Sequence, residues 1–385
     1  DVLYRDEEEI DISYEKGCVD LDAFSGNRCQ ATDKHEDDRY TLRYRVYYPK
    51  KTVHDYETTP LPLMVIFHAG GFSECSDYDD GGNENDKLAI MASEFARKGF
   101  ICVLAHYRTG RIKDGATKYT STSQSFGAYR SIQDAKGLLR SIVKRDAVNG
   151  HGNPGGSGGY RFKINTSQIF IGGLSAGGIA ALGAAYYRNQ NQINKVFPEA
   201  GNSDMDIEAA MSPLIASQYY ENNVNAATPV IRGVLSCWSG FAIPKDDDDD
   251  EADFINGGGG LSNPPMIAFH GAADGIIKYP DDDDQDFYFS KDPPGKKEDY
   301  CLYTTGTFKI KKTEVKADVK VKLGSSYNMY HILDNVTGLN RFAELYEDTN
   351  AGHGIVLPAS NYGLTSPTKD EIFMYIVQRA AVFFQ

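Results

Sequence analysis

The pattern Gly-x-Ser-x-Gly occurs twice in the sequence, and each match offers a serine whose hydroxyl could attack a carbonyl carbon. Ser157 lies in the Gly-rich stretch NGHGNPGGSGGY, and no strand-like run precedes it. Ser175 lies in SQIFIGGLSAGGIAALGAAYYRN, where an apolar run ends and a run of small residues begins. A serine hydroxyl is a weak nucleophile, so either serine needs a base, an acid that orients the base, and N–H donors for the oxyanion.

The context of Ser175 favours it over Ser157 as the nucleophile. An apolar strand is expected before it and a helix directly after it, and this is the strand–turn–helix setting of a nucleophile elbow. Gly173 and Gly177 provide room where such a turn brings backbone segments close together. The N-terminus of the following helix favours developing negative charge. The alternative is a tight strand–helix turn that carries a serine incidentally.

The oxyanion donors are expected from two places. The stretch VIFHAGGF puts Gly70 and Gly71 after a buried strand, where a glycine pair lets backbone N–H groups face a site without obstruction. Ala176 contributes the N–H that follows the candidate nucleophile. A plain turn is the alternative interpretation of the glycine pair.

Asp274 is the best candidate for the acid. It follows the apolar strand PPMIAFHG, so it lies at the carboxyl edge of the expected sheet, where α/β active sites are found. The run Asp281 to Asp284 is close in sequence, but a charge run is typical of a solvated loop.

His353 is the best candidate for the base. It lies in a Gly-flanked loop after the expected strand RFAELY, so the order Ser, Asp, His is kept along the chain. His68 and His270 end strands but belong to turn motifs of their own, His331 falls in a helical pattern, and His106 could line the site.

Strands and helices alternate along most of the chain, which predicts an α/β fold with a mostly parallel sheet and helices on both faces. The expected strands cover 41–48, 61–68, 100–107, 167–173, 229–238, 264–271 and 341–348, the first of them at an edge. The expected helices cover 85–99, 123–146, 176–189, 327–338 and 368–384. Residues 1–40 are expected as an N-terminal extension, and an acidic insertion is expected at about 279–323, before His353.

The composition limits the partners. The net charge of −14 disfavours nucleic acid and anionic membranes, and no apolar run is long enough to span a bilayer. No cysteine or histidine spacing is typical of a zinc site, and the Asp runs lack the spacing of a calcium loop, so no metal and no cofactor are expected. Cys102 is expected as a buried thiol, and Cys18 with Cys29 as a disulfide. The start DVLYRDEEEI, without Met, favours a processed, secreted or periplasmic protein.

Four motifs occur in order, HAGG, GLSAG, HGAAD and AGHG, and together they resemble the esterases and lipases of the α/β-hydrolase superfamily, of the carboxylesterase and hormone-sensitive-lipase type. The resemblance covers about residues 41–385. It implies Ser175 as nucleophile, Asp274 as acid and His353 as base, and Gly70, Gly71 and Ala176 as oxyanion donors. Ala69 stands where the HGGG motif of that family has its first glycine. The stretch AHYR, residues 105–108, resembles a D-Y-R stretch of the family, and Arg108 could pair with Asp134 of the expected helix 123–146.

The resemblance implies a serine carboxylic-ester hydrolase that acts on short-chain or carbohydrate-linked esters of the acetyl or feruloyl type. Trp238, after the strand 229–238, is either a stacking platform for such a substrate or a core residue. A lipase or a serine peptidase of the same fold is the first alternative. A non-catalytic binding protein of the same fold is the second. A calcium-dependent interaction protein is the third, and it rests only on the Asp runs. The sequence leaves open the oligomeric state, whether 279–323 covers the pocket and whether the Asp runs bind calcium.

Overall fold

The structure of the protein is a computed structural model. The acidic runs, Ser157, Arg108 and Cys29 lie outside the residues that the structure describes. The described residues are 2–5, 18–19, 40–41, 44–50, 60–72, 87–107, 113–114, 118–119, 128–129, 131–139, 142–143, 163–187, 192, 195–196, 229–243, 263–277, 322–337, 343–348, 351–354 and 369–384.

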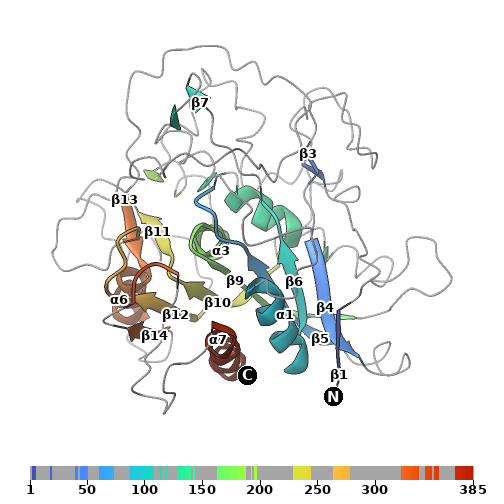
Figure 1. Cartoon of the computed structure of the whole chain (residues 1–385). Helices are drawn as coiled ribbons and strands as arrows, with labels where there is room; N and C mark the ends of the chain where they lie inside the picture. Colours follow the sequence, from blue (N-terminus) through green and yellow to red (C-terminus); the bar gives the residue numbers. More distant parts are fainter. Residues whose placement is uncertain are drawn as a thin grey trace.

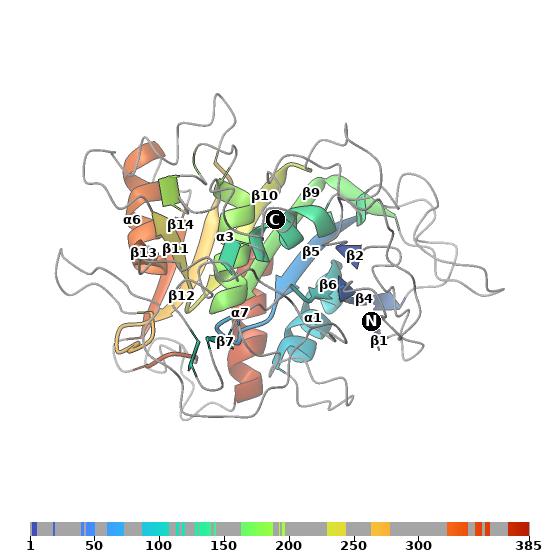
Figure 2. The same cartoon turned by 90° about the horizontal axis from the view of Figure 1, so that it is seen from above.

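One eight-stranded sheet organises the molecule, in the order β1-β4-β6-β5-β9-β10-β12-β14 (Figure 1). Its strands are β1 Val2–Arg5, β4 Tyr44–Lys50, β5 Leu61–Phe67, β6 Ile101–Ala105, β9 Ile164–Leu174, β10 Ile231–Cys237, β12 Met266–Gly271 and β14 Ala343–Asp348. All neighbours from β6 to β14 are parallel, whereas β4 is antiparallel to both β6 and β1. Figure 2 shows these strands following one another across the molecule from β4 to β14.

The central strands are apolar along their length because helices cover both faces of the sheet. Alternate residues of β5 point to opposite faces, so Leu63, Val65 and Phe67 belong to one core and Met64 and Ile66 to the other. The parallel register between β5 and β9 pairs residues 63–67 with 169–173 and ends both strands at the same edge. Whatever follows these strands therefore meets at that edge.

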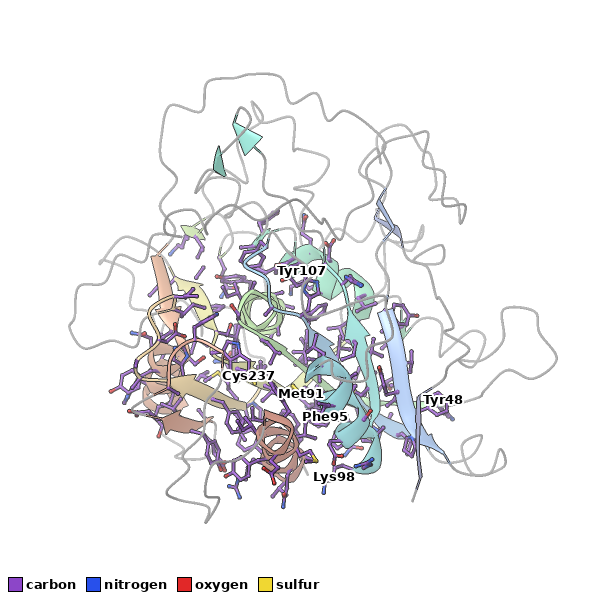
Figure 3. All side chains as sticks on the ribbon, in the orientation of Figure 1. Tyr48, Met91, Phe95, Lys98, Tyr107 and Cys237 are labelled. Carbon is purple, nitrogen blue, oxygen red and sulfur yellow. The ribbon has the colours of Figure 1, made fainter. Side chains whose placement is uncertain are left out.

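Helices α1 Lys87–Arg97 and α7 Lys369–Phe383 cover one face of the sheet together (Figure 1). Met91 and Phe95 of α1 lie in the core beneath it (Figure 3). Helix α3 Ala176–Tyr186 covers the opposite face with the helical residues 128–129, 131–139 and 142–143 and with α6 Ser326–Thr337. Each face thus has its own apolar core.

Three two-stranded sheets lie apart from the main one. The pair β11 Gly240–Ile243 and β13 Lys322–Ser325 is antiparallel and directly precedes α6. The other pairs are β2 Cys18–Val19 with β3 Tyr40–Thr41 and β7 Lys113–Asp114 with β8 Lys118–Tyr119.

The mostly parallel sheet with helices on both faces confirms the predicted α/β-hydrolase fold class. The prediction of 41–48 as an edge strand is wrong, because residues 2–5 of the expected N-terminal extension add β1 beyond β4. Cys102 is a buried free thiol, as predicted, and so is Cys237. The proposed Cys18–Cys29 disulfide and nearly all of the insertion 279–323 fall outside the described residues.

Candidate active site

Ser175 occupies a sharp turn between β9 and α3. Its backbone has φ 51° and ψ −118°, a conformation that L-residues rarely adopt and that costs on the order of 1–3 kcal/mol. The flanking glycines are required by backbone contacts. A Cβ on Gly173 would lie closer than 3.0 Å to the backbone of Gly177, and one on Gly177 closer than 3.0 Å to the carbonyl oxygens of Phe67 and His68. The turn therefore packs directly on the end of β5.

A continuous set of hydrogen bonds joins Ser175, His353 and Asp274. The Oγ of Ser175 lies 2.8 Å from Nε2 of His353, and Nδ1 of His353 lies 2.8 Å from Oδ2 of Asp274. An ionised carboxylate only accepts hydrogen bonds, so Nδ1 of His353 carries the proton and Nε2 accepts from the serine hydroxyl. Ser175 is 7% exposed and the side chain of His353 16% exposed, so both lie at the rim of the core.

The carboxylate of Asp274 is held on both oxygens. Oδ1 accepts hydrogen bonds from the backbone N–H groups of Ile276 at 2.8 Å and Ile277 at 2.9 Å, while Oδ2 faces His353. Burial of Asp274 by itself raises its pKa, but contacts with His270 and His353, and the N–H of Ile276, more than offset burial. The pKa of Asp274 therefore lies well below its ordinary value, and the group is ionised at neutral pH.

His270 is a further member of the site, although its sequence context indicates only a turn motif. It is fully buried at the end of β12, and its Nε2 donates to the carbonyl oxygen of Ile277 at 2.9 Å. The same nitrogen lies 3.4 Å from Oδ2 of Asp274. The signal in the sequence was the spacing of four residues between this histidine and Asp274 in HGAAD, directly after a buried strand.

The loop after β5, which carries two of the predicted oxyanion donors, has an unusual backbone. Gly70, Gly71 and Phe72 have φ angles of 121°, 56° and 61°, so three residues in succession lie in or near the left-handed region. Phe72 is buried, and its ring packs edge-on against Tyr107. Ala176, the third predicted donor, is the first residue of α3 and is buried.

Tyr107 fixes the orientation of this loop. Its hydroxyl donates to the carbonyl oxygens of His68 at 3.0 Å and Ala69 at 3.4 Å, and its ring stacks on the His68 imidazole with centroids 4.3 Å apart. In a trans peptide the C=O and the next N–H point in opposite directions. The N–H of Gly70 therefore points away from Tyr107.

The remaining candidates from the sequence lie elsewhere. His106 packs edge-on against His68, and His331 is exposed on α6 between Tyr327 and Tyr330. Trp238 is buried, and its ring packs edge-on against Phe373 of α7, so it is a core residue and not a platform for a substrate.

Within the described part of the chain, no group of three or more His, Cys, Asp and Glu side chains is placed to hold a metal ion. Among the helices that the structure describes, none is long and apolar enough to cross a bilayer. The chemistry that the arrangement can perform is proton transfer from the Ser175 hydroxyl to His353, with the resulting imidazolium stabilised by Asp274.

No family model and no curated protein matches the sequence. Among solved structures, the chain is similar to the butyrate-bound form of a thermophilic esterase, esterase 2 of the planctomycete Thermogutta terrifontis, with 14% identity, a TM-score of 0.44, and 89% of this chain and 88% of that chain covered. It is also similar to the apo form of that esterase, with 13% identity, a TM-score of 0.43, and 91% and 95% covered. Similarity at this level does not establish a function, so we draw the function from the geometry of the site.

Proposed function

We propose that this protein is a serine hydrolase of carboxylic esters, with Ser175 as nucleophile, His353 as general base and Asp274 as the acid that orients the base. The observation that carries the proposal is the pair of 2.8 Å contacts from Ser175 Oγ to His353 Nε2 and from His353 Nδ1 to Asp274 Oδ2. The strained backbone of Ser175 supports it, because such strain gathers at functional sites.

In the proposed reaction, His353 takes the proton of Ser175 as its Oγ bonds to the ester carbonyl carbon. The oxyanion is held by the N–H groups of Gly70, Gly71 and Ala176. The C–O bond to the alcohol then breaks, and His353 gives its proton to the leaving alcohol. Water, deprotonated by His353, attacks the acyl carbon of the acyl-enzyme. The bond from that carbon to Ser175 Oγ then breaks, His353 returns the proton to Oγ, and the acid is released. Loss of one N–H donor to the oxyanion is expected to cost about 2.7–4 kcal/mol of transition-state stabilisation.

Short-chain or carbohydrate-linked esters are the proposed substrates, and the motifs HAGG, GLSAG, HGAAD and AGHG are what supports them. Trp238 no longer supports an aromatic platform, since it lies in the core against Phe373. The class of acyl group is therefore best decided by a series of chain lengths rather than by one aromatic ester.

The test is hydrolysis of p-nitrophenyl acetate, butyrate and palmitate by the wild type and by two matched variants, Ser175→Ala and Ser157→Ala. We expect activity that falls with acyl length, is lost in Ser175→Ala and is kept in Ser157→Ala. Preference for palmitate would favour a lipase, and cleavage of peptide anilides but no ester would favour a peptidase.

A fluorophosphonate probe completes the test, because it reports on the nucleophile without requiring a correct substrate. Labelling of the wild type but not of Ser175→Ala is the expected result. A folded wild type that neither labels nor hydrolyses any ester would contradict the proposal and favour a binding protein. Labelling that persists in Ser175→Ala would contradict the choice of nucleophile.

A further inference from the structure

The strained conformation of Ser175 needs a partner that holds it. Its side chain bonds to His353 and makes no capping hydrogen bond to the start of α3, so the main-chain contacts of Ser175 are the ones that can hold its backbone. Both main-chain polar groups of Ser175 meet the same short segment, 237–239, where β10 ends. Figure 3 labels Cys237 in the middle of the molecule, between α3 and α7 in that view.

The two contacts clamp Ser175 from one side. Its N–H donates to the carbonyl oxygen of Cys237 at 2.9 Å, and its carbonyl oxygen accepts a hydrogen bond from Oγ of Ser239 at 2.8 Å. The N–H of Ile179 donates to the same carbonyl at 3.1 Å, as the first turn of α3 requires. Ser239 is thus the side chain that fixes the peptide following Ser175.

A second strained residue brings Ser239 into this position. Trp238 has φ 38°, and its N–H donates to the carbonyl oxygen of Phe269 at 2.6 Å while its ring packs against Phe373. In a regular strand, Cys237 and Ser239 would continue along β10. The left-handed residue between them turns the chain, so that the carbonyl of one and the hydroxyl of the other both reach Ser175.

The elbow is shaped to admit Ser239. A Cβ on Gly178 would lie closer than 3.0 Å to both Cβ and Oγ of Ser239, so the first turn of α3 passes directly over this side chain. Gly178 lies outside the Gly-x-Ser-x-Gly pattern, and this contact explains why a third glycine follows Gly177.

Ser239 is itself held by α6. Its carbonyl oxygen accepts hydrogen bonds from both the N–H and the Oγ of Ser326, each at 2.9 Å, and Oγ of Ser326 lies 3.0 Å from Oγ of Ser236. These three serines are fully buried. The nucleophile turn is therefore connected through Ser239 to the first residue of α6.

We infer that Ser239 is a positioning residue for the nucleophile, a role that rests on the proposed function of Ser175. With the carbonyl of Ser175 held by Ser239, the Cα–Cβ bond of Ser175 has one direction, and Oγ stays within 2.8 Å of Nε2 of His353. Without this hydrogen bond, the strained peptide relaxes and Oγ moves away from the base. A displacement of about 1 Å in a reacting group can lower a rate about a hundredfold.

The test compares Ser239→Ala with Ser236→Ala. Both changes remove one buried hydroxyl near the end of the same strand, but of these two hydroxyls only that of Ser239 is hydrogen-bonded to Ser175. We expect Ser239→Ala to lower kcat for p-nitrophenyl butyrate, and the rate of fluorophosphonate labelling, by about ten- to a hundredfold with KM within about twofold. Ser236→Ala should keep kcat within about threefold of the wild type, and both variants should have similar midpoints of urea unfolding.

A crystal structure of Ser239→Ala keeps the inference testable if the wild type hydrolyses no ester. The expected change is a rotated Ser175 carbonyl and an Oγ–Nε2 distance to His353 beyond hydrogen-bonding range. An unchanged Ser175, or equal losses of kcat in the Ser239→Ala and Ser236→Ala variants, would overturn the role of Ser239. Inactivity of the wild type together with the expected movement would overturn only the proposed function.

Discussion

Replacing Asp274 by Asn should disable the site through a proton on the wrong nitrogen of His353. The backbone N–H groups of Ile276 and Ile277 both point at Oδ1, so the amide oxygen of the new Asn must occupy that position. The amide NH2 then faces His353 Nδ1, and it also approaches the Nε2–H of His270, which already donates to Ile277. His353 has to accept at Nδ1, and its proton moves to Nε2.

In that tautomer Nε2 of His353 donates toward Ser175 Oγ and cannot take its proton. The expected loss in kcat is about 10⁴-fold, which is roughly 5 kcal/mol of transition-state stabilisation. The assay is the hydrolysis of p-nitrophenyl butyrate at neutral pH, with the midpoint of urea unfolding measured on the same preparations. Asp274→Ala is the matched variant. It also leaves the N–H groups of Ile276 and Ile277 without their acceptor, so it should unfold at lower urea than the Asn variant.

The two variants separate orientation from charge. If the wrong tautomer limits the rate, kcat of the Asn variant is no higher than that of the Ala variant, although the Asn variant is the more stable protein. A folded Asn variant with kcat/KM within tenfold of the wild type would refute the assignment of Asp274 as the orienting acid.

Three further results are expected. The pKa of Asp274 is lowered on folding, so its ionisation stabilises the fold fully at pH values above its unfolded pKa of about 4. In urea unfolding, the stability advantage of the wild type over Asp274→Asn should therefore shrink as the pH falls below about 4. An advantage that stays constant from pH 7 to 3 would contradict this. Gly177→Ala should lower the melting temperature and abolish activity, because the new Cβ meets backbone carbonyls. Gly275→Ala should leave both unchanged, because its Cβ would have no atom of the described residues within 4 Å apart from those of its two chain neighbours. Tyr107→Phe keeps the ring but loses the hydrogen bonds of its hydroxyl to the loop that carries Gly70. We expect kcat and the affinity for a trifluoromethyl ketone to fall together by about fivefold at constant KM. A change in KM alone would contradict the role of Tyr107.

Much of the fold follows from local sequence patterns. Continuous apolar runs such as 61–68 and 100–107 are sufficient to predict buried parallel strands, and the small residues around Ser175 predict a tight turn into a helix. The order Ser, Asp, His predicted three residues that the structure joins through two hydrogen bonds, both of them to the histidine. In each case the signal lies within one strand and the loop that follows it.

What the sequence does not predict depends on contacts between distant segments. The pair β11 and β13 joins residues about 80 positions apart, and no local pattern fixes that register. The positive φ of Trp238 has no signature in the sequence either, because this residue type rarely adopts it; in the structure Trp238 packs against Phe373 and its N–H donates to Phe269. The hydrogen bond between Ser239 and Ser175 depends on that turn, so it could not be predicted from the sequence either.

The position of α7 in the chain has a consequence for biosynthesis. The core between α1 and the sheet is completed by α7, and Phe384 after it stacks on Phe170 of β9 with centroids 4.4 Å apart. About 210 residues separate these two rings, so at the usual rate of 5–20 residues per second a ribosome makes the second ring about 10–40 s after the first. During that interval α1 is the only one of these two helices available to cover this face of the nascent sheet, and it is then that a chaperone would have the most apolar surface to bind.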